Sequence, residues 1–525
     1  MELELERIPL DGFLPVLDAP VAQEETMESI VPDACPDLLS ICDTEGVVCL
    51  HRKEAMEGRV ELSGAIHAML MCQPDGETGL RRLEVELPFT CTADAPGITP
   101  DCRVVAMPRL RGADARLVNP RKVLVRADLV LDVQVFAPVS DQVCASVLSP
   151  GQAGVEQLNQ PCQTCVTVCV QEKPFPFSDE LTLPGSRPEA EALLKWRAAL
   201  ECSEAKVIGS KLIFKGAARL QVVYRCADGG LSSGEFELPI SQLMEVTGAG
   251  EEAICQVGLI LTDLDCQLDD GDGRTISVSM GLLAQAVVRE ERSLTLLTDV
   301  YSTLYDLDPE TQAISLSRVA DRGEREIAVR ELLETGVSPQ DVLDCYVTIG
   351  DVTQNREGER VALSAQANVT MLCRAESGEI TAVTRTVPVV CPVELSEGTR
   401  CACRCACIAP VYAAPAAGGV EVRFPMRFSW LALTTSRVAA VSAITFDENA
   451  PKSHAADGLR RRAPLGYRQG LQHHRPGCDA GQRPGRGGSA RWAAASYSQK
   501  AIGYQRKNGR RWRPFFLGRM ALGRL

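Results

Sequence analysis

Three stretches of this chain share one pattern, and the repetition limits the fold more than any other feature of the sequence. The stretches are residues 58–89, 210–240 and 359–389. Each one contains a strand-like run with a small residue, then a cysteine, a glycine-containing turn, a second strand-like run and a proline. The small residue is Gly64, Gly216 or Ala365. Such self-similarity indicates tandem copies of one structural unit.

Each stretch predicts a β-hairpin, because side chains alternate at period two on both sides of a turn. Upstream, short segments begin at Pro36, Pro188 and Pro339. A proline followed by Asp, Glu or Gln suits the first turn of a helix, so these segments predict short helices. They precede the closing prolines, Pro88, Pro239 and Pro388, by 52, 51 and 49 residues.

Each unit continues into a further strand-like run, at residues 121–136, 274–288 and 419–433. The expected fold is therefore mainly β: three tandem, sandwich-like modules with short helices, followed by a basic tail that we expect to be disordered. The predicted boundaries are 1–150, 170–299, 322–446 and, for the tail, 451–525. Linkers are expected near residues 137–160 and 300–322, and each module is long enough to bury a core.

Composition supports a globular protein, with 45% hydrophobic and 24% charged residues. No run of about 18 uncharged apolar residues occurs, which argues against a membrane span. The acidic start, MELELERIPL, has no apolar segment typical of a secretory signal. We therefore expect a cytoplasmic protein with reduced cysteines.

The net charge of −14 combines two unlike parts. Residues 451–525 carry 17 Lys and Arg against 2 Asp and Glu, whereas residues 1–450 carry 38 against 67. The acidic body argues against nucleic-acid binding by that part, which would need cations to neutralise phosphates. Residues 1–450 contain only two histidines, His51 and His67. Because histidine is the most common acid–base catalyst, this scarcity lowers the expectation of acid–base catalysis. No motif for a catalytic triad or a nucleotide-binding loop is present, so we predict no enzyme and no catalytic or cofactor-binding residue.

The order of strand, glycine-containing strand, Asp-Gly turn and strand ending in proline resembles the SPOCS domain of spore-coat proteins. The resemblance covers roughly residues 27–445 as three copies. It is strongest to the SipL type of coat morphogenesis protein, in which SPOCS modules precede a C-terminal LysM module. The resemblance implies a location in the mother-cell cytoplasm at the forespore surface. It also implies binding, mainly through the LysM region, to the morphogenetic ATPase of the coat basement layer and to other coat proteins.

Two groups of cysteines could be metal ligands, since thiolates at short spacing can share a metal ion. They are Cys162, Cys165 and Cys169, and then Cys401, Cys403, Cys405 and Cys407. Residues two apart on a strand also share one face, where cysteine packs as a small apolar side chain. Neither group has a matching second half, so we predict core packing and no bound metal. The acidic turn at Asp269, Asp270 and Asp272 lacks the later Glu of a calcium loop and is predicted to be a solvated turn.

The tail loses all apolar periodicity and is rich in Gly, Arg and Pro. Shifting its codons by one base permits a LysM-like sequence from about residue 464 to a stop codon at residues 502–503. We therefore interpret the tail as a LysM region lost to a frameshift. The alternative is a genuine basic tail that binds anionic partners.

The leading hypothesis is a non-catalytic structural adaptor in spore-coat assembly during sporulation. A cysteine-based metal module and a binder of peptidoglycan-type glycan through a LysM region are the alternatives, followed by a nucleic-acid binder that acts through the tail.

Overall fold

The computed structural model describes residues 3–451, apart from residues 78, 149, 151–153, 270, 337 and 359. This part of the chain contains nineteen strands and no helix, which confirms the mainly β prediction. The strands lie within one compact unit. The predicted tail, with its frameshift interpretation, falls outside the described residues except for Pro451.

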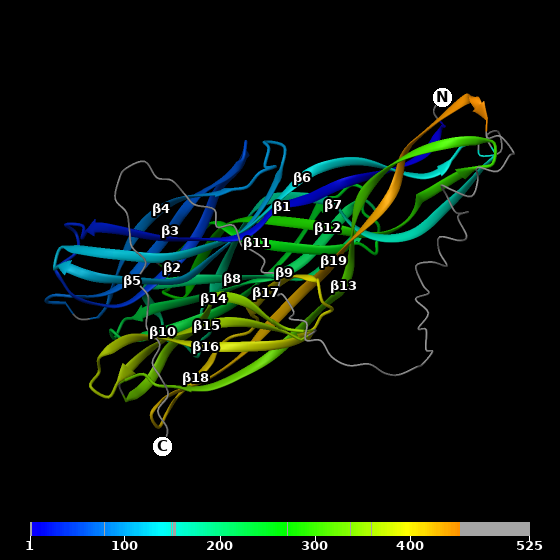
Figure 1. The fold of residues 1–525 in the computed structure, drawn as a ribbon. Coiled ribbons are helices and arrows are strands. Elements are labelled where there is room, and N and C mark those ends of the chain that lie inside the picture. The colour runs from blue at the N-terminus through cyan, green and yellow to red at the C-terminus, as the bar shows by residue number, and fades with distance from the viewer. Residues whose placement is uncertain are drawn as a thin grey trace, which may run out of the picture. The chain divides into compact units, whose positions relative to one another are not determined.

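The strands fall into three groups of matching order, which we call modules one, two and three (Figure 1). Module one comprises β1 (Leu5–Ile30), β2 (Leu38–Met56), β3 (Arg59–Pro74), β4 (Arg81–Asp94), β5 (Arg103–Asn119) and β6 (Lys122–Val147). Module two comprises β7 (Val155–Thr182), β8 (Ala190–Ile208), β9 (Lys211–Cys226), β10 (Leu231–Glu245), β11 (Ile254–Leu268) and β12 (Thr275–Ser302). Module three comprises β13 (Tyr305–Leu333), β14 (Pro339–Glu357), β15 (Arg360–Ala375), β16 (Ile380–Glu394), β17 (Arg400–Cys407), β18 (Tyr412–Ala416) and β19 (Gly419–Pro451).

Each module contains two packed sheets. One sheet holds the second, third and fourth strands, in the orders β2-β3-β4, β8-β9-β10 and β14-β15-β16. In the other, the last long strand pairs with both the first and the fifth: β1-β6-β5, β7-β12-β11 and β13-β19-β17, with β18 also on β19. Modules one and two share a six-stranded sheet, because β1 and β7 pair at Phe13 and Thr167.

Apolar side chains fill the space between the two sheets of each module. In module one, Leu62 and Ile66 of β3 belong to the same buried cluster as Val125 and Leu129 of β6, and all four are fully buried. Corresponding clusters occupy modules two and three. The alternation predicted from sequence is plain in β4, where buried and exposed side chains alternate from Leu83 to the end of the strand.

The closing prolines occupy equivalent places in the outer strands β4, β10 and β16. Pro88 stands opposite Ala65, and Pro239 stands opposite Ala217. Pro388 stands opposite Gln366. Because proline has no N–H to donate, it is found mainly in edge strands and helps to stop edge-to-edge pairing with other chains.

The predicted helices are wrong, because the segments after Pro36, Pro188 and Pro339 form the starts of β2, β8 and β14. The pairing register of each of these strands shifts twice within its first six residues, for example at Leu38/Ser40 and at Ile41/Asp43 in β2. A bulge moves the following side chains to the opposite face. Two close bulges therefore give apolar residues the three- and four-residue spacing that is typical of a helix.

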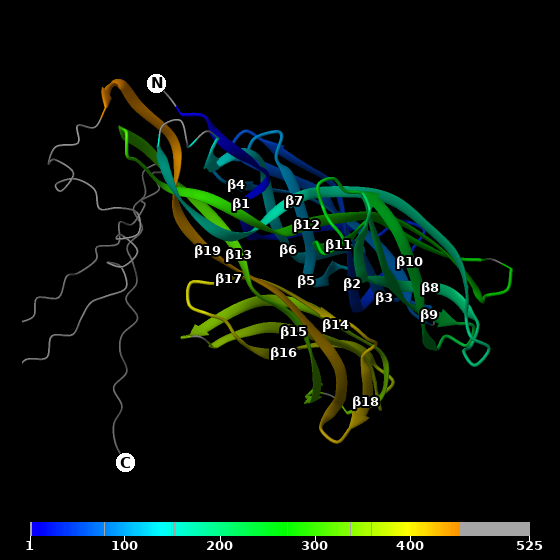
Figure 2. The ribbon, with the colours of Figure 1, turned by 90° about the vertical axis from the view of Figure 1, so that its right-hand side faces the viewer.

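The first and last strands of each module continue past the sandwiches, and their ends pack against one another (Figures 1 and 2). One cluster at this place combines side chains of β6, β12, β13 and β19: Cys144, Val147, Leu297, Val300, Leu307, Val441 and Ile444. Most residues of the two expected linkers are strand residues here, because β7 begins at Val155 and β13 at Tyr305. These segments looked like linkers because a two-stranded ribbon buries only part of its side chains. The module boundaries themselves stay a prediction.

Candidate functional site

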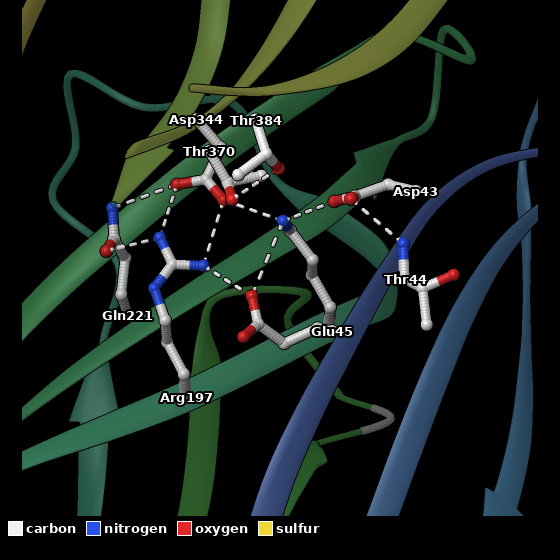
Figure 3. A network of polar contacts seen from close by, with 9 residues as sticks. Asp43, Thr44, Glu45, Arg197, Gln221, Asp344, Thr370 and Thr384 are labelled. Carbon is white, nitrogen blue, oxygen red and sulfur yellow. Dashed lines mark hydrogen bonds and ion pairs between the residues drawn. The ribbon is translucent and has the colours of Figure 1, made fainter. Parts of the chain in front are cut away.

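The residues just after the second bulge of β2, β8 and β14 meet between the modules. They are Asp43, Lys195 and Asp344, which stand opposite Met71, Val223 and Leu372 in β3, β9 and β15. Two residues further along are Glu45, Arg197 and Tyr346. The equivalent strands bulge at the same place, and therefore equivalent side chains from three modules converge on one buried cluster (Figure 3). We call these six residues the ionic junction.

Lys195 is the centre of the ionic junction. Its Nζ donates a hydrogen bond to Asp43 Oδ2 at 2.5 Å, and lies 2.8 Å from Asp344 Oδ2 and 3.6 Å from Glu45 Oε2. The Lys195 side chain is 1% exposed, and those of the three carboxylates are 0–4% exposed. An amine of module two thus joins carboxylates of modules one and three without water access.

Arg197 forms a two-pronged ion pair with Asp344. Its Nη2 lies 2.7 Å from Asp344 Oδ1, and its Nη1 lies 3.0 Å from Oδ2. Nη1 also donates to Glu45 Oε2 at 2.8 Å. Gln221 of β9 completes the arrangement, since it accepts from Arg197 at 2.6 Å and donates to Asp344 Oδ1 at 3.0 Å (Figure 3). Such paired, charge-assisted bonds fix geometry as well as adding energy.

Tyr346 contributes an aromatic wall to the ionic junction. Its ring centroid lies 3.9 Å from the guanidinium carbon of Arg197 and 5.2 Å from Lys195 Nζ. Both cations therefore make cation–π contacts with the residue of module three that is equivalent to Glu45 and Arg197. Burial raises the pKa of the Tyr346 phenol, so the ring stays neutral.

The charges of the ionic junction do not balance, since three carboxylates face two cations. Burial alone would raise the pKa of Asp344, but attraction by Arg197 and Lys195 lowers it below its ordinary value of 3.8. Burial would lower the pKa of Lys195, but the surrounding carboxylates raise it. Burial raises the pKa of Glu45 above 4.5, against the attraction of both cations. A proton on Glu45 would make the cluster neutral, which is the form that burial favours.

The fifth strands of the modules also meet. Met107 of β5, Gly258 of β11 and Arg404 of β17 stand opposite Asp132, Gln285 and Ser429 of the last strands. A Cβ added to Gly258 would lie 2.6 Å from Met107 Sδ and 3.8 Å from Arg404 Nη1. The absence of a side chain in module two thus makes room for the side chains of the other two modules.

Further polar contacts connect each pair of modules. Lys53 Nζ donates to Gln285 Oε1 at 2.5 Å between modules one and two. Arg109 Nη1 donates to the carbonyl of Gly350 at 2.5 Å between modules one and three. Arg219 Nη2 donates to the carbonyl of Cys407 at 2.7 Å between modules two and three. The three modules therefore close a ring of contacts within one chain.

Arg197 also lines a mostly apolar pocket of about 260 Å³ with residues of β2, β5, β8 and β11. Its walls include Val47, Met107 and Leu259, and Arg197 is its only titratable lining residue. Acid–base catalysis requires a group of suitable pKa within reach of a substrate. In this pocket the Arg197 guanidinium is already paired with Asp344 and Glu45.

The four cysteines of β17 share a face of the strand, as their spacing predicts. Cys401, Cys403, Cys405 and Cys407 all pack against the apolar core of module three. Burial raises the pKa of the thiols, to about 12 for Cys403 and Cys405. Protonated thiols in such surroundings pack as small apolar side chains.

Two of the three cysteines of β7 belong to different clusters, and the third, Cys165, is buried. Cys162 packs among the ribbon residues near Leu294, whereas Cys169 belongs to the core of module two. A register shift at Thr167 and Cys169 separates them further. No group of three or more His, Cys, Asp or Glu residues suited to a metal ion occurs among the described residues.

In the acidic turn around Asp269 and Asp272, the aspartate side chains accept hydrogen bonds from backbone N–H groups of the same turn. Asp272 Oδ1 accepts hydrogen bonds from the N–H groups of Arg274 and Thr275, at 2.7 and 2.9 Å. These bonds lower the pKa of Asp272. Asp269 Oδ1 likewise accepts from Gly271 at 3.2 Å. Asp270 lies outside the described residues.

Sequence reasoning missed the ionic junction, because its residues lie within or just after the segments taken for helices. A signal was present. Asp43, Lys195 and Asp344 each precede the small residue of their repeat, Gly64, Gly216 or Ala365, by the same 21 positions. Aligning the repeats on that residue places a cation between two carboxylates.

No helix among the described residues is long and apolar enough to cross a membrane. Comparison with curated proteins and with solved structures found no match to this chain. A family model described as "SipL, SPOCS domain" matches residues 37–118 and 189–269. These ranges cover β2–β5 of module one and β8–β11 of module two, and they include Asp43, Glu45, Lys195 and Arg197. The repeated strand order and the family match agree, and together they identify SPOCS domains in modules one and two.

Proposed function

We propose that this chain is a non-catalytic structural adaptor of spore-coat assembly, which links the coat basement layer to the forespore surface in the mother-cell cytoplasm. The SPOCS match associates the chain with a sporulation-related coat function. The observation that carries the adaptor role is the ionic junction, in which two cations of module two hold carboxylates of both other modules. A chain built in this way presents three fixed surfaces to partners.

The proposed partners are the morphogenetic ATPase of the coat basement layer and other coat proteins. The family resemblance assigns ATPase binding mainly to a LysM region. The test therefore compares this chain with a version whose tail is translated after a one-base shift before Pro464. The frame-shifted version should bind the ATPase at both moderate and high salt. The chain with the present basic tail should lose most of its ATPase binding at high salt, where surface attraction is screened.

This experiment distinguishes ATPase binding by the tail from ATPase binding by the SPOCS modules. Equal, salt-resistant binding by both versions would assign the ATPase contact to the SPOCS modules and refute the tail interpretation. Absence of binding by both versions would count against the adaptor proposal itself.

Location gives a second test. A fluorescent fusion produced in sporulating cells should form a shell around the forespore on the mother-cell side. Uniform fluorescence through the mother cell, with the coat still attached, would contradict the adaptor role.

A further inference from the structure

Lys195 brings a primary amine against carboxyl groups in a place closed to water. Its side chain is 1% exposed, and that of its nearest partner, Asp43, is 2% exposed. Amines and carboxylic acids condense to amides only when water is kept away and the groups are held together. Positioning of this kind can raise the effective concentration of one group beside another to about 10⁵ M or more.

The two aspartates at Lys195 differ in chemistry. Asp344 accepts hydrogen bonds from both Nη atoms of Arg197, and this cation and Lys195 lower the pKa of Asp344. Asp344 therefore stays a carboxylate, which is a poor target for a nucleophile. Asp43 makes no bond to Arg197 in the described contacts. Its Oδ2 contacts Lys195, while its Oδ1 accepts a hydrogen bond from the backbone N–H of Thr44 at 2.9 Å (Figure 3). That donor is placed to stabilise negative charge on Oδ1 during attack at Cγ.

Glu45 supplies the remaining requirement, a group that can carry a proton beside the amine. Its Oε2 lies 3.6 Å from Lys195 Nζ, and it comes from the same strand as Asp43. Burial raises its pKa, so the carboxyl group is suited to giving and taking a proton within the closed site.

We propose that Lys195 Nζ and Asp43 Cγ form an intramolecular amide bond that joins module two to module one. The ammonium first passes a proton to the Asp43 carboxylate. The free amine then attacks Cγ, and Oδ2 leaves as water after Glu45 relays the second proton from nitrogen. One ammonium and one carboxylate thus become one amide and one water, with no oxidant or other reactant.

The ion pair is the resting state, because the carboxylates raise the pKa of Lys195 despite its burial. Bond formation is therefore slow and follows folding. Burial still drives the reaction, since a neutral amide avoids the desolvation of an ammonium and a carboxylate. The bond closes a loop from residue 43 to residue 195, so the second strands β2 and β8 stay connected even in the unfolded chain.

The test is the intact mass of the full chain, measured under denaturing conditions at intervals after purification. The expected mass is lower than the sequence mass by one water molecule. Tryptic mapping should show no cleavage after Lys195 and one branched peptide that joins residues 43 and 195. A mass equal to the sequence mass after prolonged incubation overturns the proposal, and so does a water loss that maps elsewhere.

Matched variants assign the roles. Lys195→Arg keeps the cation but cannot form the bond, so it should keep the sequence mass. Glu45→Gln should slow the loss of water by at least about tenfold, given the usual contribution of proton transfer. Asp344→Asn should still lose water, because Asp344 is not the acceptor. Should a variant fail to fold, the mass and peptide map of the unmodified chain still decide the question.

Discussion

Module two differs from its neighbours at the ionic junction, where side chains of all three modules touch. Modules one and three place Asp43 and Asp344 after the second bulge, whereas module two places Lys195 there. The first two bulges of β2, β8 and β14 fall at equivalent positions. Three identical copies would bring three like charges together in a buried site, which is strongly unfavourable. The alternation of charge therefore specifies a ring with one copy of each module.

A second comparison concerns the small residue of the repeat. A Cβ added to Gly64 would lie 2.1 Å from the carbonyl oxygen of Cys49, and one added to Gly216 would lie 2.0 Å from that of Glu201. Module three has Ala365 at this place. The bulge beside Ala365 has a different form: Gly350 and Asp351 of β14 and Gln366 of β15 have no register partner, whereas modules one and two leave one residue of the facing strand without a partner. We attribute the alanine of module three to this different bulge.

Replacement of the central cation should have the largest effect on this arrangement. Lys195→Met leaves the buried carboxylates of Asp43 and Asp344 with less compensation, and we expect a loss of about 3–5 kcal/mol in the free energy of unfolding. Urea denaturation measures the change. Lys215→Met is the control, because Lys215 is 58% exposed and pairs with an exposed Glu204, so its change should stay below about 1 kcal/mol. Similar midpoints for the two variants would contradict the importance of the ionic junction.

The bulge comparison gives the next largest effect. Gly64→Ala and Gly216→Ala should each destabilise the chain by about 1–3 kcal/mol, because the new methyl group meets a backbone carbonyl. The reverse change in module three, Ala365→Gly, creates no clash and should cost about 1 kcal/mol or less. Thermal unfolding of the three variants ranks them. A harmless Gly64→Ala change would contradict the close approach of the Cys49 carbonyl to Gly64.

The pH dependence of stability sharpens the charge comparison. The pKa of Asp344 in the folded chain is below 3.8, so its contribution is present above that pH and is lost as the pH falls. For Glu45 the sign is opposite: its pKa is raised above 4.5, so its contribution is present below that value and lost as the pH rises through the folded pKa.

Below about pH 4, the unmodified chain should lose stability more steeply than Asp344→Asn, by up to about 1.4 kcal/mol per pH unit for one proton. Urea midpoints measured in parallel over this range give the difference. Parallel pH profiles for the two chains would show that Asp344 is not paired in the folded protein.

The cysteine strand should give the smallest effect. Cys403→Ser places a hydroxyl against the core of module three and should cost about 1–2 kcal/mol. Ala402→Ser changes an exposed neighbour on the same strand and should stay within about 0.5 kcal/mol. Addition of zinc should leave the thermal midpoints of both variants and of the unmodified chain unchanged. A zinc-dependent shift that Cys403→Ser abolishes would restore the metal hypothesis.

The repeated hairpins were predictable because each strand buries one face. Burial of one face makes apolar and polar residues alternate along the sequence. The alternation of β4 is the clearest case. The starts of β2, β8 and β14 were not predictable in the same way, since their paired bulges give a helical spacing to residues that form strands. Strand pairing, which is a long-range interaction, overrode the local pattern.

The sequence by itself determined the repeated hairpins and the inward packing of the β17 cysteines, because both follow from periodic burial within a short segment. Only the tertiary structure decided that Asp43, Lys195 and Asp344 meet, although 152 residues separate the first two. A lone charged residue in a strand carries no local sign of its partner. Its burial becomes tolerable only when another module supplies the opposite charge, and that is a property of the closed ring.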